Sequence, residues 1–168
     1  MYGALGPLSL ASPPYLDRDP LGGTGSGMIR VCPHCRSKNR VPASKLDGAA
    51  RCGKCHEPLG ALAEPVAVES AADFDGLLQT SRAPVLVDFW ASWCGPCVAV
   101  APELERLARD RAGEALVAKV DTEALPDVAS RFGIRSIPTL ILFRNGAEAA
   151  RVSGAMPAEE IARRVGLE

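Results

Sequence analysis

Residues 83–98 read APVLVDFWASWCGPCV, and this stretch decides the fold. Its first half, residues 83–90, is an almost continuous apolar run, which is typical of a central strand covered on both faces in a parallel α/β sheet. Cys94 and Cys97 follow at once, and apolar residues continue beyond them at helical spacing: Val98, Ala101, Leu104, Leu107 and Ala108. The stretch therefore predicts a buried strand that leads directly into a helix, with Cys94 at the helix N-terminus.

The flanking sequence continues the alternation of strands and helices. Upstream, residues 66–68 form a candidate strand, and Ser70 is typical of a helix N-cap. Downstream, Asn145-Gly146 between apolar runs is a strong hairpin signal, so the last two strands should be antiparallel. The other expected elements are a strand at 115–120, a short helix near 126–132, strands at 139–143 and 148–152, and a terminal helix from Pro157. The predicted fold class is α/β, with a central mixed β-sheet flanked by helices.

The length and composition suit one ordinary domain with a small appendage. The 168 residues are 47% apolar, which is enough for one packed core. The formal net charge of -1 gives no overall attraction to nucleic acid or to an anionic membrane. No stretch approaches the roughly 18 to 20 apolar residues that a membrane span needs. We expect a soluble, cytoplasmic protein that binds neither nucleic acid nor membrane, and we expect it to be a monomer.

The sequence divides into four segments. Residues 1–27 are rich in Gly, Pro and Ser, and they lack the basic start and continuous apolar run of a secretory signal. We interpret them as a disordered or non-native extension, with Met28 as an alternative start. The other segments are a four-cysteine module (residues 28–60), a linker (residues 61–65) and a dithiol domain (residues 66–168).

The four-cysteine module cannot stabilise its fold by apolar burial alone. It has few large apolar residues, and about 30 residues fall below the size at which domains fold without a staple. Its pattern, Cys-x2-Cys-x16-Cys-x2-Cys, falls inside the four-cysteine zinc pattern, in which two tight turns aim four thiolates at one tetrahedral ion. We expect one structural Zn²⁺, with Gly53 helping the second turn. The predicted ligands are Cys32, Cys35, Cys52 and Cys55.

Other interpretations of this module stay open. The cysteines could form two disulfides or remain free thiols, although a reducing compartment disfavours disulfides. His34 and His56 lie beside the cysteines, but four thiolates already complete the shell, so we expect both at the surface. Cys32-Pro-His-Cys35 contains the dipeptide of oxidising thiol oxidases, yet it follows no strand and opens no helix. Basic residues gather between residues 30 and 54, and we interpret them as solvated surface.

The dithiol domain resembles the thioredoxins. The resemblance rests on VDFWASWCGPC (87–97), FGIRSIPTLILFRNG (132–146) and the Val152-Ser-Gly-Ala stretch, and these motifs are highly specific. It covers about residues 66–168. With the four-cysteine module in front, the chain is similar to the bacterial thioredoxins that carry an N-terminal zinc-binding domain. The resemblance implies a thioredoxin fold, preceded by a small zinc-ribbon-like module, and a protein-disulfide reductase.

The position of the dithiol is suited to disulfide exchange, which requires a thiolate. A Cys at a helix N-terminus gains from unpaired N–H groups and from the helix dipole, because both stabilise its anion. We therefore expect Cys94 to attack a client disulfide. Cys97 is then placed to resolve the mixed disulfide by attacking the sulfur of Cys94 and expelling the client thiolate.

Asp88 stands inside the apolar run, where burying a carboxylate is costly. Burial should raise its pKa into the range that is useful for proton transfer. The resemblance implies that Asp88 accepts the proton of Cys97 during resolution, through water, and that Lys119 on the neighbouring strand tunes its charge. The alternative is a structural carboxylate that backbone donors satisfy.

A contact surface for client proteins is expected around the dithiol. Ile137-Pro138 resembles the cis-proline loop of the family, and a cis bond there would expose the preceding backbone for strand-like pairing with a client peptide. A core position is the alternative for Trp93, whereas Trp90 is expected in the core. The predicted surface consists of Trp93, Gly95, Pro96, Ile137, Pro138 and Gly154.

The leading function is the reduction of protein disulfides in client proteins. The resemblance implies recharging by a flavin-dependent, NADPH-fed thioredoxin reductase. The chain itself needs no bound flavin or nicotinamide, because no Gly-rich dinucleotide motif follows a strand. Three alternatives remain: a thiol oxidase or isomerase, a zinc-ribbon binding or adaptor protein, and a redox-sensing module in which oxidised thiolates release the metal.

Overall fold

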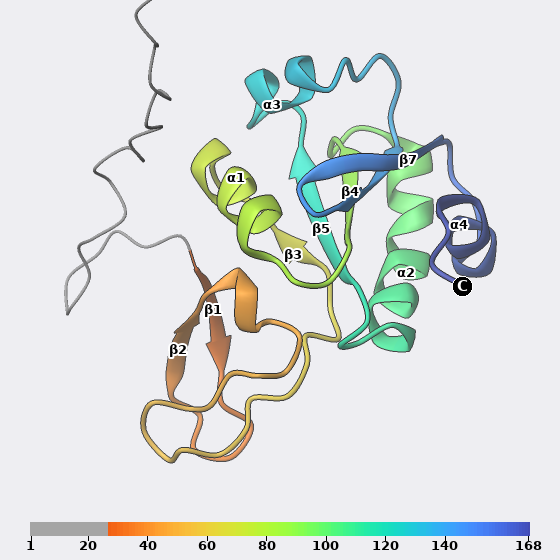
Figure 1. The fold of residues 1–168 in the computed structure, drawn as a ribbon. Coiled ribbons are helices and arrows are strands. Elements are labelled where there is room, and N and C mark those ends of the chain that lie inside the picture. The colour runs from red at the N-terminus through yellow and green to blue at the C-terminus, as the bar shows by residue number, and fades with distance from the viewer. Residues whose placement is uncertain (1–26) are drawn as a thin grey trace, which may run out of the picture.

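The computed structural model describes residues 27–168, so the prediction for residues 1–27 falls almost entirely outside the described part. The dithiol domain is built on a five-stranded mixed sheet (Figure 1). Its strands, in spatial order, are β3 (Val66–Ala67), β5 (Leu116–Asp121), β4 (Val85–Trp90), β6 (Thr139–Arg144) and β7 (Ala147–Ser153). The central strand β4 runs parallel to β5 and antiparallel to β6. The predicted fold class is confirmed.

Helices cover both faces of this sheet (Figure 1). They are α1 (Ala71–Thr80), α2 (Gly95–Asp110), α3 (Pro126–Arg131) and α4 (Ala158–Val165). Side chains of α1 and α3 pack on one face with Val87 and Phe89 of β4. Side chains of α2 and α4 pack on the other face with Leu86. Because side chains alternate along a strand, Asp88 belongs to the face that α2 covers.

Local signals in the sequence place these elements as predicted. The Ser70 side chain accepts a hydrogen bond from the backbone N–H of Asp73 and caps α1. Asn145 and Gly146 have φ angles of 52° and 78°, and two successive left-handed residues are what a tight hairpin turn requires. The strands β6 and β7 that they join are antiparallel, as the Asn-Gly signal predicted.

The apolar stripe of α2 differs from the predicted one in its first turn. Val98 is 61% exposed, while the buried side chains of this helix begin with Cys97 and Val100 and continue with Leu104, Leu107 and Ala108. The first turn of α2 follows the end of the central strand, and within residues 27–168 Val98 is left exposed there. Helical spacing therefore predicts the buried stripe correctly only for the part of the helix that lies over the sheet.

The four-cysteine module lies against the α1 side of the dithiol domain (Figure 1). It contains an antiparallel pair, β1 (Met28–Val31) and β2 (Lys38–Val41), followed by a short 3₁₀ helix, η1 (Ala43–Lys45). The expectation that Cys32 follows no strand is wrong, because β1 ends directly before it, but no helix begins at this cysteine pair. Leu46 is fully buried in the cluster that also holds Phe74 of α1. The linker continues this contact, because the N–H of Leu62 donates to the carbonyl of Leu46 at 2.9 Å. Module and domain thus share one apolar cluster.

Within residues 27–168, no helix combines the length and the apolar character that a membrane crossing would need.

Candidate functional site

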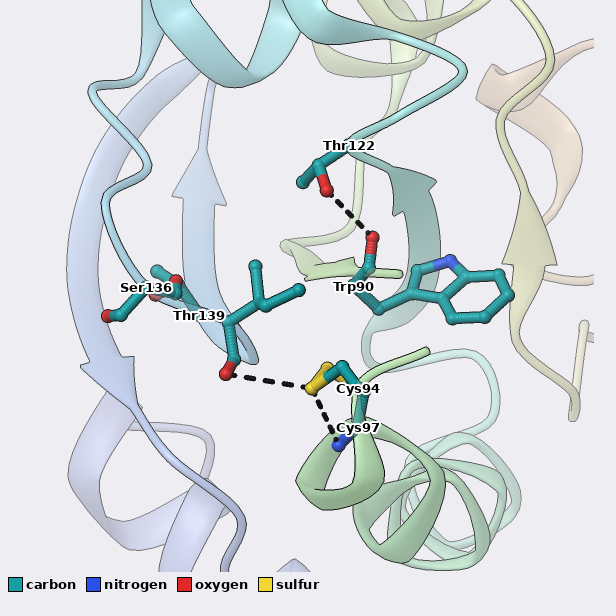
Figure 2. The surroundings of a disulfide bond; sticks show 7 residues. Trp90, Cys94, Cys97, Thr122, Ser136 and Thr139 are labelled. Carbon is teal, nitrogen blue, oxygen red and sulfur yellow. Dashed lines mark hydrogen bonds between the residues drawn. A yellow bond between two sulfur atoms is a disulfide. The ribbon is translucent and has the colours of Figure 1, made fainter. Parts of the chain in front are cut away.

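Cys94 and Cys97 form a disulfide at the N-terminus of α2 (Figure 2). Cys94 is the N-cap residue, and its Sγ accepts a hydrogen bond from the backbone N–H of Cys97 at 3.2 Å. Both cysteines are largely covered, and Cys94 is 4% exposed. The N–H of Cys97 in the first helical turn therefore points toward the Cys94 sulfur at the positive end of the helix dipole, which is the arrangement that stabilises a thiolate once the disulfide is reduced.

The loop before β6 faces this disulfide. The Ile137-Pro138 peptide bond is cis, as the resemblance implied, and the carbonyl oxygen of Ile137 lies 3.7 Å from the Sγ of Cys94. Gly154, which follows β7, donates its N–H to the carbonyl of Pro138 at 2.9 Å. Three segments that are far apart in the sequence therefore meet at the dithiol.

The aromatic residues beside the dithiol have different environments. Trp93 is 69% exposed, so the core alternative for Trp93 is wrong. Gly95 and Pro96 are exposed next to it, and a Cβ at Gly95 would meet no atom within 4 Å. Trp90, which was expected in the core, is only half-buried, and its indole extends away from the disulfide (Figure 2). With the exposed Val98, these residues give the surface around the dithiol an apolar character.

Asp88 is buried beneath this surface with 0% exposure. Both of its carboxylate oxygens lack a hydrogen-bond partner within residues 27–168, so the alternative of a carboxylate satisfied by backbone donors finds no support. Burial raises the pKa of Asp88 to about 7, while the positive charge of Lys119 acts in the opposite direction. Asp88 and Lys119 are directly paired between β4 and β5. A carboxyl that titrates near neutral pH can both take up and release a proton.

The four cysteines of the N-terminal module converge on one point. Their Sγ atoms all lie within 4.8 Å of one another, and the Cys32–Cys55 and Cys35–Cys52 sulfur pairs are each 3.6 Å apart. Zinc–sulfur bonds of about 2.3 Å in a tetrahedron require sulfur atoms about 3.8 Å apart, so the donor set fits one Zn²⁺. His34 and His56 are exposed and lie outside this cluster, as predicted.

Each Cys-x-x-Cys turn of the module closes in the same way. The residue after the second cysteine, Arg36 in one turn and His56 in the other, is left-handed with a φ of 61°. Its N–H donates to the carbonyl of the first cysteine at 3.0 Å. Gly53 is not left-handed, and its N–H donates to Oδ1 of Asn39 at 2.8 Å. The prediction that Gly53 supplies the backbone freedom of the turn is therefore wrong, because the strained position comes later in each turn.

Ser37 is a polar neighbour of the thiols that the sequence did not reveal. Its Oγ lies 3.1 Å from the Sγ of Cys35 and 3.1 Å from the Sγ of Cys52. Hydrogen bonding to this hydroxyl is the largest cause that lowers the pKa of Cys52, to about 5, and it also lowers the pKa of Cys35. Burial and the neighbouring thiols raise the pKa of Cys55 in the same cluster, so the effect of Ser37 is confined to the two thiols that it contacts. Thiolate is the form that zinc binds, so Ser37 favours the metal-binding state.

Thr139 is a second polar residue that sequence reasoning missed. It is 2% exposed, and its hydroxyl donates to the carbonyl of Ser136 at 2.7 Å. Its Oγ1 also lies 2.9 Å from the Oγ of Ser153 on β7. These contacts fix the start of β6 directly after Pro138. The sequence did contain a signal for this residue, because Thr139 is a polar residue at the start of the apolar run 139–143. Asp88 was found from the same kind of signal.

Comparison with protein families matches both cysteine-bearing parts of the chain. A family model described as "Thioredoxin" matches residues 65–166. A second one, described as "Thioredoxin 2, N-terminal", matches residues 31–57, which contain all four cysteines of the module.

Individual relatives agree with these matches. Thioredoxin C-3 of Corynebacterium nephridii is 43% identical over 134 residues, which are 80% of this chain and 90% of that relative. The chloroplastic M-type thioredoxin of Zea mays is 47% identical over 94 residues, 56% of this chain and 56% of its own length. Among solved structures, a mutant thioredoxin from Halobacterium salinarum is 33% identical, with a TM-score of 0.58, covering 62% of this chain and 90% of that one.

Proposed function

The chain belongs to the thioredoxin family and is a thiol–disulfide oxidoreductase that reduces protein disulfides, and from this premise we propose how its residues divide the work. The observation that carries the proposal is the position of Cys94. Its sulfur caps α2, accepts the N–H of Cys97 and faces the Ile137 carbonyl. The first thiolate of the reaction therefore forms on Cys94, where the helix N-terminus stabilises it.

The reaction proceeds in two exchanges. The Cys94 thiolate attacks one sulfur of the client disulfide, which forms a mixed disulfide and releases the other client sulfur as a thiolate. Cys97 then loses its proton and attacks the Cys94 sulfur, which expels the second client thiolate and leaves the Cys94–Cys97 disulfide. Two electrons pass from the dithiol to the client. The disulfide found at the start of α2 is the product of this sequence.

Asp88 accepts the proton of Cys97 in the second exchange. It lies on the sheet face that α2 covers, and its raised pKa of about 7 suits a group that takes up and then releases a proton near neutral pH. Lys119, its strand partner, favours the ionised form of Asp88 and so keeps it available as a base. Transfer through a bridging water is consistent with full burial of the carboxylate.

Clients bind around the dithiol as extended peptides. The backbone before Pro138 offers a strand-like pairing edge, and the exposed ring of Trp93 provides apolar contact. Gly95, Pro96 and Gly154 leave the surface shallow, so that a disulfide within a folded client can reach Cys94. Chemistry of this kind requires no particular client sequence.

The four-cysteine module binds one structural Zn²⁺ through Cys32, Cys35, Cys52 and Cys55. All four ligand positions would be filled by thiolates, so the metal would have no open position for a reaction and would serve to hold the module together. The linker (residues 61–65) separates it from the dithiol domain, and residues 28–60 and 66–168 form the two units.

The oxidised dithiol is recharged by thioredoxin reductase, and the clients are disulfide-containing proteins. Both fit a cytoplasmic, monomeric protein in a reducing compartment, where four zinc thiolates also remain reduced. Neither flavin nor nicotinamide needs to bind the chain, because the electrons arrive by disulfide exchange with the reductase.

Insulin reduction coupled to NADPH and thioredoxin reductase tests this proposal. Cys94→Ser should abolish turnover, and Cys97→Ser should accumulate a client mixed disulfide that mass spectrometry detects. Zinc content, measured on the same samples, should stay at one ion per chain in both variants. Turnover that survives in Cys94→Ser would overturn the assignment of the nucleophile.

A further inference from the structure

An open cleft of about 510 Å³ lies between the linker and α2. The linker contributes residues 63–65, and α2 contributes three residues spaced four apart, which therefore share one helix face. Lys119 of β5 also lines the cleft. The lining residues from α2 are Ala101, Glu105 and Arg109.

Lys119 lines this cleft and is also a neighbour of the buried Asp88. Lys119 is paired with Asp88 across β4 and β5, and the next neighbour on its other side is Ala67 of β3. Val117, two residues before Lys119, packs in the cluster beneath α2, so Lys119 leaves the sheet on the α2 face, as Asp88 does. Lys119 is therefore the side chain that connects Asp88 to the cleft.

The ammonium group of Lys119 forms no ion pair within the described residues, and its contacts are an aromatic ring and the charge of Asp88. It lies 4.4 Å from the centroid of the Trp90 ring, and within residues 27–168 no carboxylate lies within ion-pair distance of it. Glu64 and Glu105 are exposed and form no ion pair or side-chain hydrogen bond within the described part. The long side chain of Lys119 can therefore place its ammonium closer either to the buried Asp88 or to the carboxylates of the cleft.

Other charged groups near Asp88 are few. On β6 its paired residue is Leu140, which carries no charge. The charges of α4 are occupied in ion pairs with one another and with Arg106. The dithiol contributes Cys94, the N-cap of α2, and Cys97. Within α2, Arg106 forms ion pairs with Glu103 and Asp110, whereas Glu105 and Arg109 line the cleft. The remaining charged groups on the elements packed around Asp88 are Lys119 and Asp121 of β5, Arg144 at the end of β6 and Glu64 of the linker.

We propose that Glu64 is a positioning residue of the dithiol reaction. Its carboxylate, together with that of Glu105 on the opposite wall, attracts the ammonium of Lys119 into the cleft. Lys119 then stabilises the ionised form of Asp88 less strongly. This inference rests on the proposed role of Asp88 as the proton acceptor. Glu64 acts through Lys119 and touches neither the client nor the dithiol.

The linker is anchored on both sides of Glu64. Leu62, two residues earlier, is buried and hydrogen-bonded to Leu46 of the four-cysteine module, and Val66 begins β3 two residues later. The backbone around Glu64 is thus anchored to the four-cysteine module on one side and to β3 on the other. The four-cysteine module therefore influences the dithiol reaction through this linker and not through its own cysteines.

Removing the Glu64 charge should leave more of the Lys119 charge acting on Asp88 and lower the pKa of that carboxyl. Asp88 accepts a proton only when ionised, so the rising limb of the resolution rate against pH should move to lower pH. For Glu64→Gln we expect a shift of about 0.3 pH unit at low ionic strength, which screening reduces at high salt. Glu105→Gln should shift the limb in the same direction.

The experiment uses the full chain and two readouts. Stopped-flow measurement of mixed-disulfide resolution gives the pH midpoint, and the ¹³C carboxyl resonance of Asp88 gives its titration directly in the reduced protein. Glu148→Gln is the matched control, because it removes one carboxylate on β7, at the opposite edge of the sheet. It should leave both midpoints unchanged.

The outcomes separate the two proposals. If the pH midpoint of the resolution rate persists in Asp88→Asn, Asp88 is not the proton acceptor. The proposed effect of Glu64 on the reaction is then overturned as well. If Asp88→Asn abolishes the midpoint but Glu64→Gln leaves the ¹³C titration of Asp88 where the control leaves it, only the role of Glu64 is overturned. A shift to lower pH that shrinks at high salt supports it.

Discussion

The two cysteine-bearing regions use the same Cys-x-x-Cys spacing on two different backbones. In the four-cysteine module, a left-handed residue follows the second cysteine, Arg36 in one turn and His56 in the other, and reverses the chain. In the dithiol domain, the second cysteine is already inside a helix, and the first is its N-cap. The first geometry aims two pairs of thiols at one point, while the second directs the backbone N–H of Cys97 and the end of a helix dipole at a single sulfur. Spacing alone therefore does not define the chemistry of a cysteine pair.

The two regions also differ in what stabilises them. The dithiol domain has apolar clusters on both faces of its sheet, whereas the module has no separate cluster within the described residues and contributes six buried side chains, two of them cysteines, to one of these clusters. The module should therefore depend on its metal and on its contact with α1, while the domain should hold its fold without either.

The largest effect is expected from breaking the metal site. Cys52→Ser removes a ligand whose thiolate Ser37 favours, so zinc should be lost and β1 and β2 should lose their protection from hydrogen exchange. Insulin reduction should stay within about threefold of wild type, because the dithiol lies on a separate backbone element. Zinc analysis and hydrogen exchange on the same sample check this. Equal loss of protection in β4 and β5 would show that the two regions fold as one unit.

Asp88→Asn should stabilise the dithiol domain in a pH-dependent way. The folded pKa of Asp88, about 7, is raised above its ordinary value of 3.8, so its contribution to stability is fully present below about pH 4 and is lost as the pH rises through 7. A shift of about three units corresponds to about 4 kcal/mol. The stability gain of the variant should therefore grow by up to this amount between pH 4 and pH 9.

Denaturant unfolding of the oxidised protein at several pH values measures this gain. Thr139→Val serves as a control, because it removes a buried polar group that does not titrate near neutral pH. A gain for Asp88→Asn that is the same at pH 4 and pH 9 would mean that the carboxyl is not titrating with a raised pKa.

The smallest effect is expected at the exposed apolar surface. Trp93→Ala should raise the KM for insulin by about three- to tenfold with little change in stability, because the ring is 69% exposed and contributes mainly to contacts with a partner. Trp90→Ala is the matched variant: its ring is half-buried beneath Lys119, so it should lower stability instead. An unchanged KM in Trp93→Ala would remove this residue from the client surface.

Much of this organisation could be predicted from the sequence because it rests on local signals. The apolar run 83–90 indicated the central strand, Asn145-Gly146 indicated the hairpin, and Asp88 was conspicuous as a charge within an apolar run. The convergence of four thiols followed from the spacing of two cysteine pairs. Each of these signals depends on neighbours in the sequence or on a repeating period.

The features that were missed depend on contacts between distant segments. The exposure of Val98 depends on which part of α2 other segments cover, which helical periodicity does not encode. Ser37 reaches Cys52 across fifteen positions of sequence. The cleft brings Glu64 and Lys119 together only because β3 adds to the edge of β5. In each case the sequence contains the residue but gives no local sign of its partner.

The most direct test of the division between the regions is a redox titration that follows each cysteine. The protein is equilibrated in mixtures of reduced and oxidised dithiothreitol, alkylated and digested, and the peptides with Cys94–Cys97 and with the module cysteines are quantified separately, along with bound zinc. We predict that only the Cys94–Cys97 peptide titrates, as a single two-electron couple, while the four module cysteines stay reduced with one zinc per chain. Module cysteines that oxidise over the same range of potentials, with release of zinc, would contradict this account.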